Sequence, residues 1–383
     1  MSSHTDPQKR HDFVYLFDVV NGNPNGDPDS GNQPRFDPDT LHGLVTDVCL
    51  KRKVRDYVAL IKEEPIFIQS QVALNRLIVE GYNSANIKLT QLPVKDADII
   101  AWFQEVQPDG FDWDEADEAF TLTYDGSQGT SAKDIQNALI EVLSDDQKHL
   151  EKALKELSSQ IAKSARKPSP EERGQARSKL MEKFYDIRMF GAVLSTGLNA
   201  GQVRGPMQLS FARSISQIFP RDISITRVAV TREADRKRKE TEMARKALVH
   251  YGLYRTNGFF SPYLADKEKN GTGVTKNDLE IFWEALLNMF NYDRSAARGE
   301  MACRGLYIFS HDNPKGNASA HKLFEMIKVS EKNYETPPRQ FLDYQVTLPE
   351  GVTLAEGATL SENVTLLPDL RLPPGVTLTV LEG

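Results

Sequence analysis

Residues 15–29, with the sequence YLFDVVNGNPNGDPD, constrain the fold of this chain more than any other stretch. Residues 15–20 are mostly aromatic or β-branched, which predicts a strand. Residues 21–29 are only Asn, Gly, Pro and Asp. Gly and Asn tolerate positive φ, Pro fixes φ, and Asn and Asp side chains bond nearby backbone amides, so these residues favour neither strand nor helix. We predict a rigid loop at the end of a strand, where functional sites often lie.

Three interpretations of this loop compete. The first is a purely structural turn. The second is a calcium site, because Asn21, Asn23 and Asn25 have the spacing of the first half of an EF-hand loop. The second half does not fit, since the twelfth position is Asn32 rather than Glu and a strand, not a helix, enters the loop. The third is a cradle for polyphosphate or an RNA backbone, in which amides and backbone N–H groups face phosphates.

Basic residues follow the loop, as the third interpretation requires. Residues 40–58 have helical apolar spacing and predict a helix that begins near Asp39 or Thr40. Its second half contains Lys51, Arg52, Lys53 and Arg55. A solvated face with i,i+4 pairing is the usual explanation of such a run, and phosphate contact is the functional alternative.

Further motifs lie downstream. They are FYDIRMFGAVLS (184–195), VRGPMQLSFARS (203–214), ISITRVAV (223–230), ALVHYGLYRTNGFFSP (247–262), FNYDRSAARGEM (290–301) and CRGLYIFSHDNPKGNASAHKLFEMIKV (303–329). Together with the first strand, its loop and the basic helix, this set resembles the Cas-seven backbone subunit of type I-C Cascade complexes, a CRISPR-associated family of the RAMP superfamily that serves antiviral defence. The resemblance covers roughly residues 12–345.

The resemblance implies an α+β fold with an RRM-like (ferredoxin-like) palm, a helical finger insertion and a thumb hairpin, followed here by a short β-rich repeat tail. The expected parts are palm segments 12–82, 184–225 and 251–345, an acidic and helical finger 83–183, a basic thumb 226–250 and a tail 346–383. The resemblance also implies a helical filament along one CRISPR RNA, with no cofactor and no catalytic role of the subunit's own. Expected partners are CRISPR RNA, target DNA through guide pairing, further copies head to tail, and other Cascade subunits of the Cas-five, Cas-eight and small-subunit types.

Net charge argues against a nucleic-acid binder until its distribution is considered. The 383 residues carry a net charge of −7, but residues 96–125 hold ten Asp or Glu and no Lys or Arg. Residues 345–383 hold five acidic residues and one Arg, so the rest of the chain has a net charge of +7. Whole-chain charge misleads when charge is segregated. No long apolar run or secretory signal is present, and Cys49 and Cys303 form no motif, so we expect a cytoplasmic protein without a membrane span.

Candidate RNA contacts extend through the central region. Arginines flank predicted strands near a glycine-containing loop at 195–201, and glycine allows a nucleic-acid backbone to approach closely. Residues 226–246 hold eight Lys or Arg, and aromatic residues follow at Tyr251, Tyr254 and 259–260, suited either to base stacking or to the core. The predicted RNA-binding set is Asn21, Asn23, Asn25, Lys51, Arg52, Arg55, Arg188, Arg204, Gly205, Gln208, Arg213, Arg227, Lys246, Tyr251 and Arg255.

The remaining patterns predict individual elements. We expect a strand within 66–78, helices at 132–143, 144–164, 277–290 and 321–326, strands at 190–195 and 306–309, and a mobile connector at 162–179. Ser144 and Gln147 form a capping box for the second helix. Residues 346–381 repeat with a period of six, which predicts short strands that form a β-solenoid, dock on another surface or stay flexible.

The rival function is an enzyme. Type III relatives of the resembled family cut target RNA with an Asp in the loop after the first strand, and Asp27 and Asp29 occupy a comparable region here. A metal-dependent endoribonuclease would use such a carboxylate, with His42 as a possible helper. No second acid or base is tied to these residues by spacing, so we favour the non-catalytic RNA scaffold.

Overall fold

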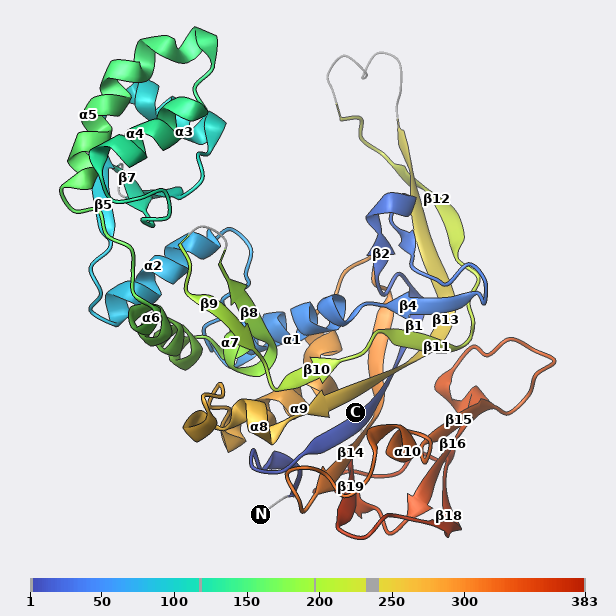
Figure 1. Cartoon of the computed structure of the whole chain (residues 1–383). Helices are drawn as coiled ribbons and strands as arrows, with labels where there is room; N and C mark the ends of the chain where they lie inside the picture. Colours follow the sequence, from blue (N-terminus) through green and yellow to red (C-terminus); the bar gives the residue numbers. More distant parts are fainter. Residues whose placement is uncertain (1–2, 117–118, 196–197, 232–240, 382–383) are drawn as a thin grey trace. The chain divides into compact units, whose positions relative to one another are not determined.

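The computed structural model describes residues 3–116, 119–195, 198–231 and 241–381 (Figure 1). The chain divides into two compact units. Unit 1 comprises Met1–Glu64 and Pro206–Gly383, and unit 2 comprises Pro65–Gly205. Unit 2 contains the whole predicted insertion 83–183 together with flanking residues on both sides. No helix in the described part of the chain is long and apolar enough to cross a membrane.

Unit 1 is built on one large sheet with β1 near its centre. The order is β17 (Thr353–Leu354), β19 (Val376–Leu381), β14 (Glu300–His311), β1 (His11–Gly22), β13 (Glu242–Phe260), β11 (Ala212–Gln217) and β4 (His42–Val45), with β10 (Met207–Leu209) and β12 (Arg221–Arg227) also pairing with β13. β1 is antiparallel to both β13 and β14. The predicted strands 15–20 and 306–309 therefore lie within β1 and β14.

Helices α1 (Asp47–Ile61) and α9 (Lys276–Tyr292) belong to the same unit and pack against each other. The apolar face of α9 meets β1, where the ring of Phe13 contacts Trp283 and that of Phe17 contacts Phe290. The Tyr15 hydroxyl donates a hydrogen bond of 2.6 Å to a carbonyl of α9. This contact buries the face that the amphipathic pattern of residues 277–290 predicts.

The opposite face of the sheet is covered by the C-terminal part of the chain. Val14, Leu16 and Phe309 are fully buried in one core with residues from this part. Its elements are α10 (Ala320–Phe324), β15 (Lys328–Glu331), η6 (Phe341–Asp343), β16 (Tyr344–Glu350) and β18 (Val364–Arg371). Both faces of the central sheet are thus occupied by the chain itself.

The repeat tail docks as strands, one of the three predicted possibilities. β19 pairs antiparallel with β14 and extends the main sheet, and β17 pairs parallel with β19. β18 pairs parallel with β16, with Val364 opposite Val346. Leu378 and Val380 are fully buried. The tail is held because alternate apolar residues of its last strand enter the core of unit 1.

Unit 2 has two parts. One contains α2 (Leu74–Ser84), α6 (Pro170–Lys183), α7 (Tyr185–Phe190) and a hairpin of β8 (Gly191–Leu194) and β9 (Gly201–Arg204). The other, the helical lobe, contains β5 (Thr90–Val94), α3 (Ala97–Val106), β6 (Phe111–Ala116), β7 (Ala119–Tyr124), α4 (Ala132–Glu141), η3 (Asp145–Leu150) and α5 (Glu151–Ala162). The predicted capping box of Ser144 and Gln147 is present and precedes η3. Trp102, Phe103 and Leu154 are buried in the lobe core.

Three element predictions are wrong. Residues 42–45 form β4 rather than helix, because Gly43 and Val45 face the core while β4 pairs with β11, and α1 begins only after its N-cap Thr46. The strand predicted within 66–78 is absent from that range, because the Asp186 carboxylate accepts hydrogen bonds from two of its backbone amides, at 2.7 and 3.1 Å.

The third wrong prediction is the mobile connector at 162–179. Most of it belongs to α6, which begins with a capping box between Ser169 and Glu172 and has Pro170 in its first turn. Ala176 and Leu180 of this helix are buried against α2 and neighbouring elements. Two buried side chains at helical spacing outweigh the polar composition of the rest.

Candidate nucleic-acid interface

The loop after β1 is tied to the rest of unit 1 by its asparagines. Asn21 has positive φ (49°) and is exposed, and its side chain forms a hydrogen bond of 3.2 Å with His250 of β13. Asn23 is buried, and its amide Nδ2 donates to the carbonyl of Asn32 at 2.7 Å. The backbone N–H of Asn23 donates to Ala297 at 2.8 Å. The loop therefore joins β13 and the turn 293–299 into one surface.

Asn25 links the loop to the start of α1. Its Oδ1 accepts hydrogen bonds from the backbone N–H of Thr46 at 3.0 Å and from the Thr46 hydroxyl at 3.1 Å. The Thr46 oxygen in turn accepts from the Cys49 N–H at 3.2 Å, which caps the helix. The loop and the N-terminal turn of α1 are thus held together by side-chain bonds.

The acidic end of the loop folds on itself. Asp27 lies in β2 (Gly26–Asp27), which pairs with β3 (Gln33–Pro34), and it caps η2 (Pro28–Ser30). Asp27 also forms an ion pair of 3.3 Å with Arg35, whereas Asp29 is exposed. Within the described residues, no group of three or more His, Cys, Asp or Glu side chains could hold a metal ion.

The basic residues of α1 differ in their surroundings. Lys51 bonds Asp47 at 2.9 Å and reaches Gln208 of β10 at 3.4 Å, so two predicted contacts from distant parts of the sequence lie together. Arg52 is exposed and pairs with Asp56 at 2.9 Å. Arg55 is only 6% exposed. The predicted i,i+4 pairing is confirmed for Lys51, whose side chain is 12% exposed, and for the exposed Arg52, whereas Arg55 is buried rather than presented to solvent.

Arg213 of β11 is a further predicted contact in unit 1. It donates to Asp37 at 2.8 Å, and this hydrogen bond is the main reason that the pKa of Asp37 is lowered to about 2. Asp37 therefore keeps its negative charge across the physiological range. Arg213 remains half-exposed, with its guanidinium oriented by a carboxylate.

The predicted RNA-binding set leaves out several cations beside the loop. Lys53 pairs with Asp293, and Asp293 also pairs with Arg298. Arg35 follows β3, and its Nε is buried without a partner among the described residues. Lys53 belongs to the basic run of α1, but its link to Arg298 through Asp293 was not predictable, because the two meet only in the folded chain.

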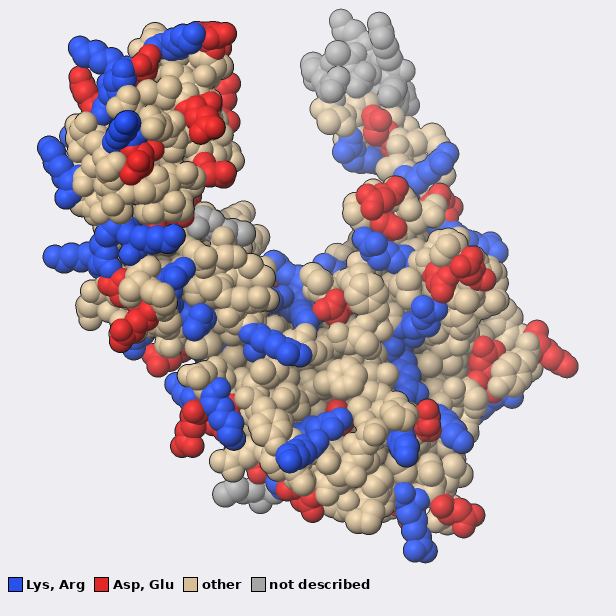
Figure 2. All heavy atoms as spheres, in the orientation of Figure 1, with Lys and Arg blue, Asp and Glu red and all other residues tan. Residues whose placement is uncertain are grey.

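The β12–β13 hairpin carries the predicted thumb residues that the structure describes. Arg227 donates to the carbonyl of Ala229 at 2.8 Å and to Thr231, and Lys246 lies opposite Ile223 in the register. Arg232, Arg236, Lys237, Arg238 and Lys239 fall outside the described residues. Figure 2 shows Lys and Arg side chains along this hairpin and over the nearby part of unit 1.

Two predicted contacts of β13 occupy structural positions. Tyr251 is 7% exposed, and its hydroxyl donates to Asp18 at 3.1 Å. Arg255 donates to the carbonyls of Phe324 and Ile327 at 2.6 and 2.7 Å, and its burial lowers its pKa. Tyr251 therefore belongs to the core rather than to an exposed stacking surface. Tyr254 and Phe260 are also buried, so of the four aromatic residues only Phe259 presents a ring to solvent. Alternation along β13 places Tyr251 and Arg255 on the face that the C-terminal part covers, whereas Tyr254 lies on the opposite face, where its ring stacks on that of Phe17.

Three predicted contacts lie in unit 2. Arg204 is exposed at the end of β9. Arg188 donates to the carbonyls of Met181 and Glu182 at 3.2 and 3.0 Å, near the end of α6. A Cβ on Gly205 would lie 2.1 Å from the backbone of Phe190, so the close approach at this glycine is made by protein. Glycine is required there for packing, contrary to the interpretation as a phosphate approach.

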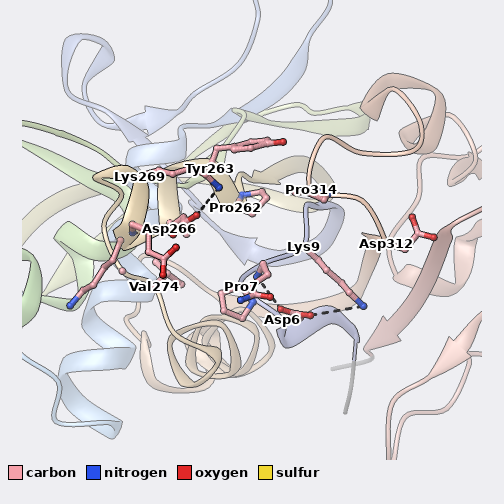
Figure 3. A pocket seen from close by; sticks show the side chains of 15 residues that line it. Asp6, Pro7, Lys9, Pro262, Tyr263, Asp266, Lys269, Val274, Asp312 and Pro314 are labelled. Carbon is pink, nitrogen blue, oxygen red and sulfur yellow. Dashed lines mark hydrogen bonds and ion pairs between the residues drawn. The ribbon is translucent and has the colours of Figure 1, made fainter.

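A separate cavity of about 680 Å³ lies between the N-terminal segment and residues 262–274, which include α8 (Pro262–Ala265) and η5 (Lys267–Lys269) (Figure 3). Lys269 pairs with Asp266 at 2.8 Å and also lies over the ring of Tyr263. Lys9 faces Asp6 at 4.0 Å. Because its lysines are matched by carboxylates, this cavity lacks the excess of cations that a phosphate chain requires.

The fold and this surface define an α+β protein with a loop–helix constellation of amides and cations beside a central antiparallel sheet. The family model of the CRISPR-associated protein Cas7 matches residues 9–110 and 130–349, and the chain belongs to this family. A CRISPR-associated protein Cas7 from Haloferax volcanii is 49% identical over 47 residues, which are 12% of this chain and 14% of that relative.

Two solved structures are also similar. A chain of a structure titled CRISPR RNA-guided surveillance complex, pre-nicking, has a TM-score of 0.42 and 17% identity, with 78% of both chains covered. A chain of a structure titled CRISPR RNA-guided surveillance complex has a TM-score of 0.38 and 15% identity, with 94% of this chain and 96% of that chain covered.

Proposed function

We propose that this chain is a non-catalytic backbone subunit of a type I-C Cascade complex. It binds CRISPR RNA by the sugar-phosphate backbone, without sequence preference, and leaves the bases free to pair with target DNA. Membership of the Cas7 family supports this proposal. Further copies of the chain and the Cas-five, Cas-eight and small-subunit types are the proposed protein partners, and the cytoplasm is the proposed location.

The observation that carries the proposal is the junction of Asn25 with the capped start of α1. This junction orients the loop amides and the first turns of α1 before any ligand binds. The contact between Lys51 and Gln208 adds a strand from another part of unit 1 to the same surface. A preoriented set of amides and cations binds a phosphate chain with little ordering cost.

The strand order supports an RRM-like palm. Within the main sheet, β14, β1, β13 and β11 are neighbours in that order, α1 follows β1, and α9 connects β13 to β14. We propose the β12–β13 hairpin as the thumb and the helical lobe of unit 2 as the finger. Because residues of the C-terminal part cover the second face of the sheet, RNA binds at the loop and α1 rather than on that face.

A backbone subunit repeats along one strand of RNA. Such repetition needs a head-to-tail interface, which generates an open helix when the rotation does not close. We propose that the thumb of one copy reaches across the RNA toward the next copy and interrupts base stacking at intervals.

Binding is tested with single-stranded RNAs of unrelated sequence. We expect wild type to shift all of them at low salt, and Lys51→Glu to weaken every complex to a similar extent because a phosphate contact is lost. Lys133→Glu, an exposed change of equal charge on α4, is the matched control. A wild-type protein that shifts none of the RNAs at low salt would refute the proposal.

The ribonuclease alternative is tested with Asp27→Ala. We expect both wild type and this variant to leave RNA intact in the presence of magnesium or manganese, because the Asp27 carboxylate is engaged by Arg35 and by the cap of η2. Cleavage by wild type that disappears in the variant would favour the enzyme instead.

A further inference from the structure

Unit 2 is strongly polarised in charge. Its helical lobe, residues 89–162, holds sixteen Asp or Glu and five Lys or Arg. The rest of the unit, residues 65–88 and 163–205, holds eleven Lys or Arg and five Asp or Glu. Figure 2 shows both acidic and basic side chains on the helical lobe and a band of basic side chains below it. A polyanion would therefore be repelled by the lobe and attracted to the other part.

Two arginines of α6 are prominent in the basic part. Arg173 and Arg177 are one turn apart on one side of the helix, while Ala176 and Leu180 anchor α6 in the core. Both arginines are partly exposed, and neither forms an ion pair with the residues that the structure describes. They differ in this from Arg166, whose charge is matched by Glu172.

The β8–β9 hairpin continues this surface. Gly201 has positive φ (93°), and a Cβ on it would lie 2.7 Å from the Arg177 guanidinium, so the absent side chain leaves room for that guanidinium beside β9. Along β9, Gln202 and Arg204 are both exposed and point to the same side of the strand. Asn199 lies at the start of β9, where it accepts from the Gly201 N–H at 2.7 Å.

We infer that Arg173, Arg177, Gln202 and Arg204 form a phosphodiester-binding surface on unit 2, which we call the α6 surface. Guanidinium groups bind phosphate oxygens with two donors each, and a side-chain amide adds a neutral donor. The adjacent acidic lobe repels the same ligand and sets the limit of the bound segment. The inference rests on the proposed nucleic-acid function for its context, but its residues lie outside unit 1.

The experiment uses the full chain with Arg173→Glu and Arg177→Glu combined. One arm measures binding of a labelled single-stranded RNA, and the other measures binding of a labelled complementary single-stranded DNA to the chain alone and to the RNA-loaded chain. The control combines Lys133→Glu and Lys152→Glu, two exposed lysines of the lobe, and changes the charge of the same unit equally. Thermal unfolding verifies folding, and Arg173→Gln with Arg177→Gln provides a milder pair.

We expect weaker binding for the arginine variants but not for the control in at least one arm. The slope of the logarithm of the binding constant against the logarithm of salt becomes shallower by about 0.7 for each lost phosphate contact. Loss in the RNA arm assigns the surface to the guide backbone, and loss confined to the DNA arm assigns it to DNA.

Equal binding by the arginine variants and the control in both arms overturns the inference and leaves the proposed function intact. A wild-type chain that binds neither RNA nor DNA refutes the inference together with the proposed function.

Discussion

At the scale of single residues, the three asparagines of the loop after β1 have different roles. Asn23 and Asn25 use their amides to hold the loop to itself and to α1. Asn21 remains exposed at the junction with His250. The loop is therefore shaped by the amides of Asn23, which is buried, and Asn25, which is partly buried, and Asn21 is the most exposed of the three.

Replacing Asn25 with Ala removes the acceptor for the Thr46 N–H and hydroxyl. We expect a loss of about 1–2 kcal/mol in the free energy of unfolding, because two partly buried donors lose their acceptor at a helix start. RNA affinity should fall as well, since the loop is no longer tied to α1. Urea unfolding and RNA gel shifts measure the two effects, with Asn83→Ala on the exposed side of α2 as control. Unchanged RNA affinity would mean that the attachment of the loop to α1 does not contribute to RNA binding.

A histidine beside β1 makes stability depend on pH. His11 is fully buried and forms hydrogen bonds with the Ser310 hydroxyl at 3.0 Å and the Asp6 carbonyl at 2.8 Å. Burial, opposed by the carbonyl and charge of Asp6 and assisted by His4 and His311, lowers the pKa of His11 from 6.5 to about 4. The folded chain therefore holds this imidazole neutral at pH values where the unfolded chain protonates it.

Between pH 6.5 and about 4 the unfolded chain binds a proton that the folded chain excludes. The free energy of unfolding should therefore decrease as pH falls through this range, by up to about 3 kcal/mol from His11. Urea unfolding at a series of pH values measures this slope, and His11→Gln should make it shallower. His321→Gln at an exposed position is the control. An identical slope in His11→Gln and wild type would contradict the assignment.

At the scale of elements, the C-terminal tail is an integral part of unit 1. β19 adds a strand to the edge of the main sheet beside β14. Its alternate residues Val376, Leu378 and Val380 join the core that also contains Leu16 of β1. The family match ends at residue 349, so most of the tail lies beyond it. The tail stabilises the sheet and covers one of its faces.

Leu378→Ala leaves a cavity in this core. We expect the free energy of unfolding to fall by about 2–5 kcal/mol, as is typical for a fully buried leucine. Leu366→Ala in β18, where the side chain is 38% exposed, should cost far less. Chemical denaturation of both variants tests the comparison. Similar small losses in the two would mean that the tail contributes little to the stability of unit 1.

At the scale of the whole molecule, charge is distributed by segment rather than evenly. The net charge is −7, yet the helical lobe and the last residues hold most of the acidic excess. Groups of basic residues lie in the loop–helix region of unit 1, in the β12–β13 hairpin and in the α6 surface of unit 2. An acidic protein can therefore carry basic surfaces that suit a phosphate chain.

Assembly along RNA is the prediction at this scale. Mixing the chain with long single-stranded RNA should give helical arrays with a fixed repeat in electron micrographs, because a head-to-tail interface propagates. High salt should dissolve the arrays by weakening phosphate contacts. The chain without RNA is the control. Irregular aggregates, or arrays of the same repeat without RNA, would argue against assembly along a guide.

Much of the architecture was predictable from local patterns. The aromatic and β-branched residues of 15–20, the apolar stripe of 277–290 and the Ser144–Gln147 capping box lie where the sequence places them. Such signals depend on residues near in sequence, so they can be interpreted before the fold is known. The same holds for the Asn-rich loop, whose composition excludes regular structure.

Other features were decided by tertiary contacts. β4 replaces the start of a predicted helix because β11 supplies a partner strand, and α6 forms because its two apolar residues, Ala176 and Leu180, pack into a core. Tyr251 and Arg255 are buried because the C-terminal part packs over their side of β13. The sequence by itself determined the loop, the basic runs and the main helices, whereas burial, which depends on residues far apart in the chain, decided which of the predicted contacts can meet a ligand.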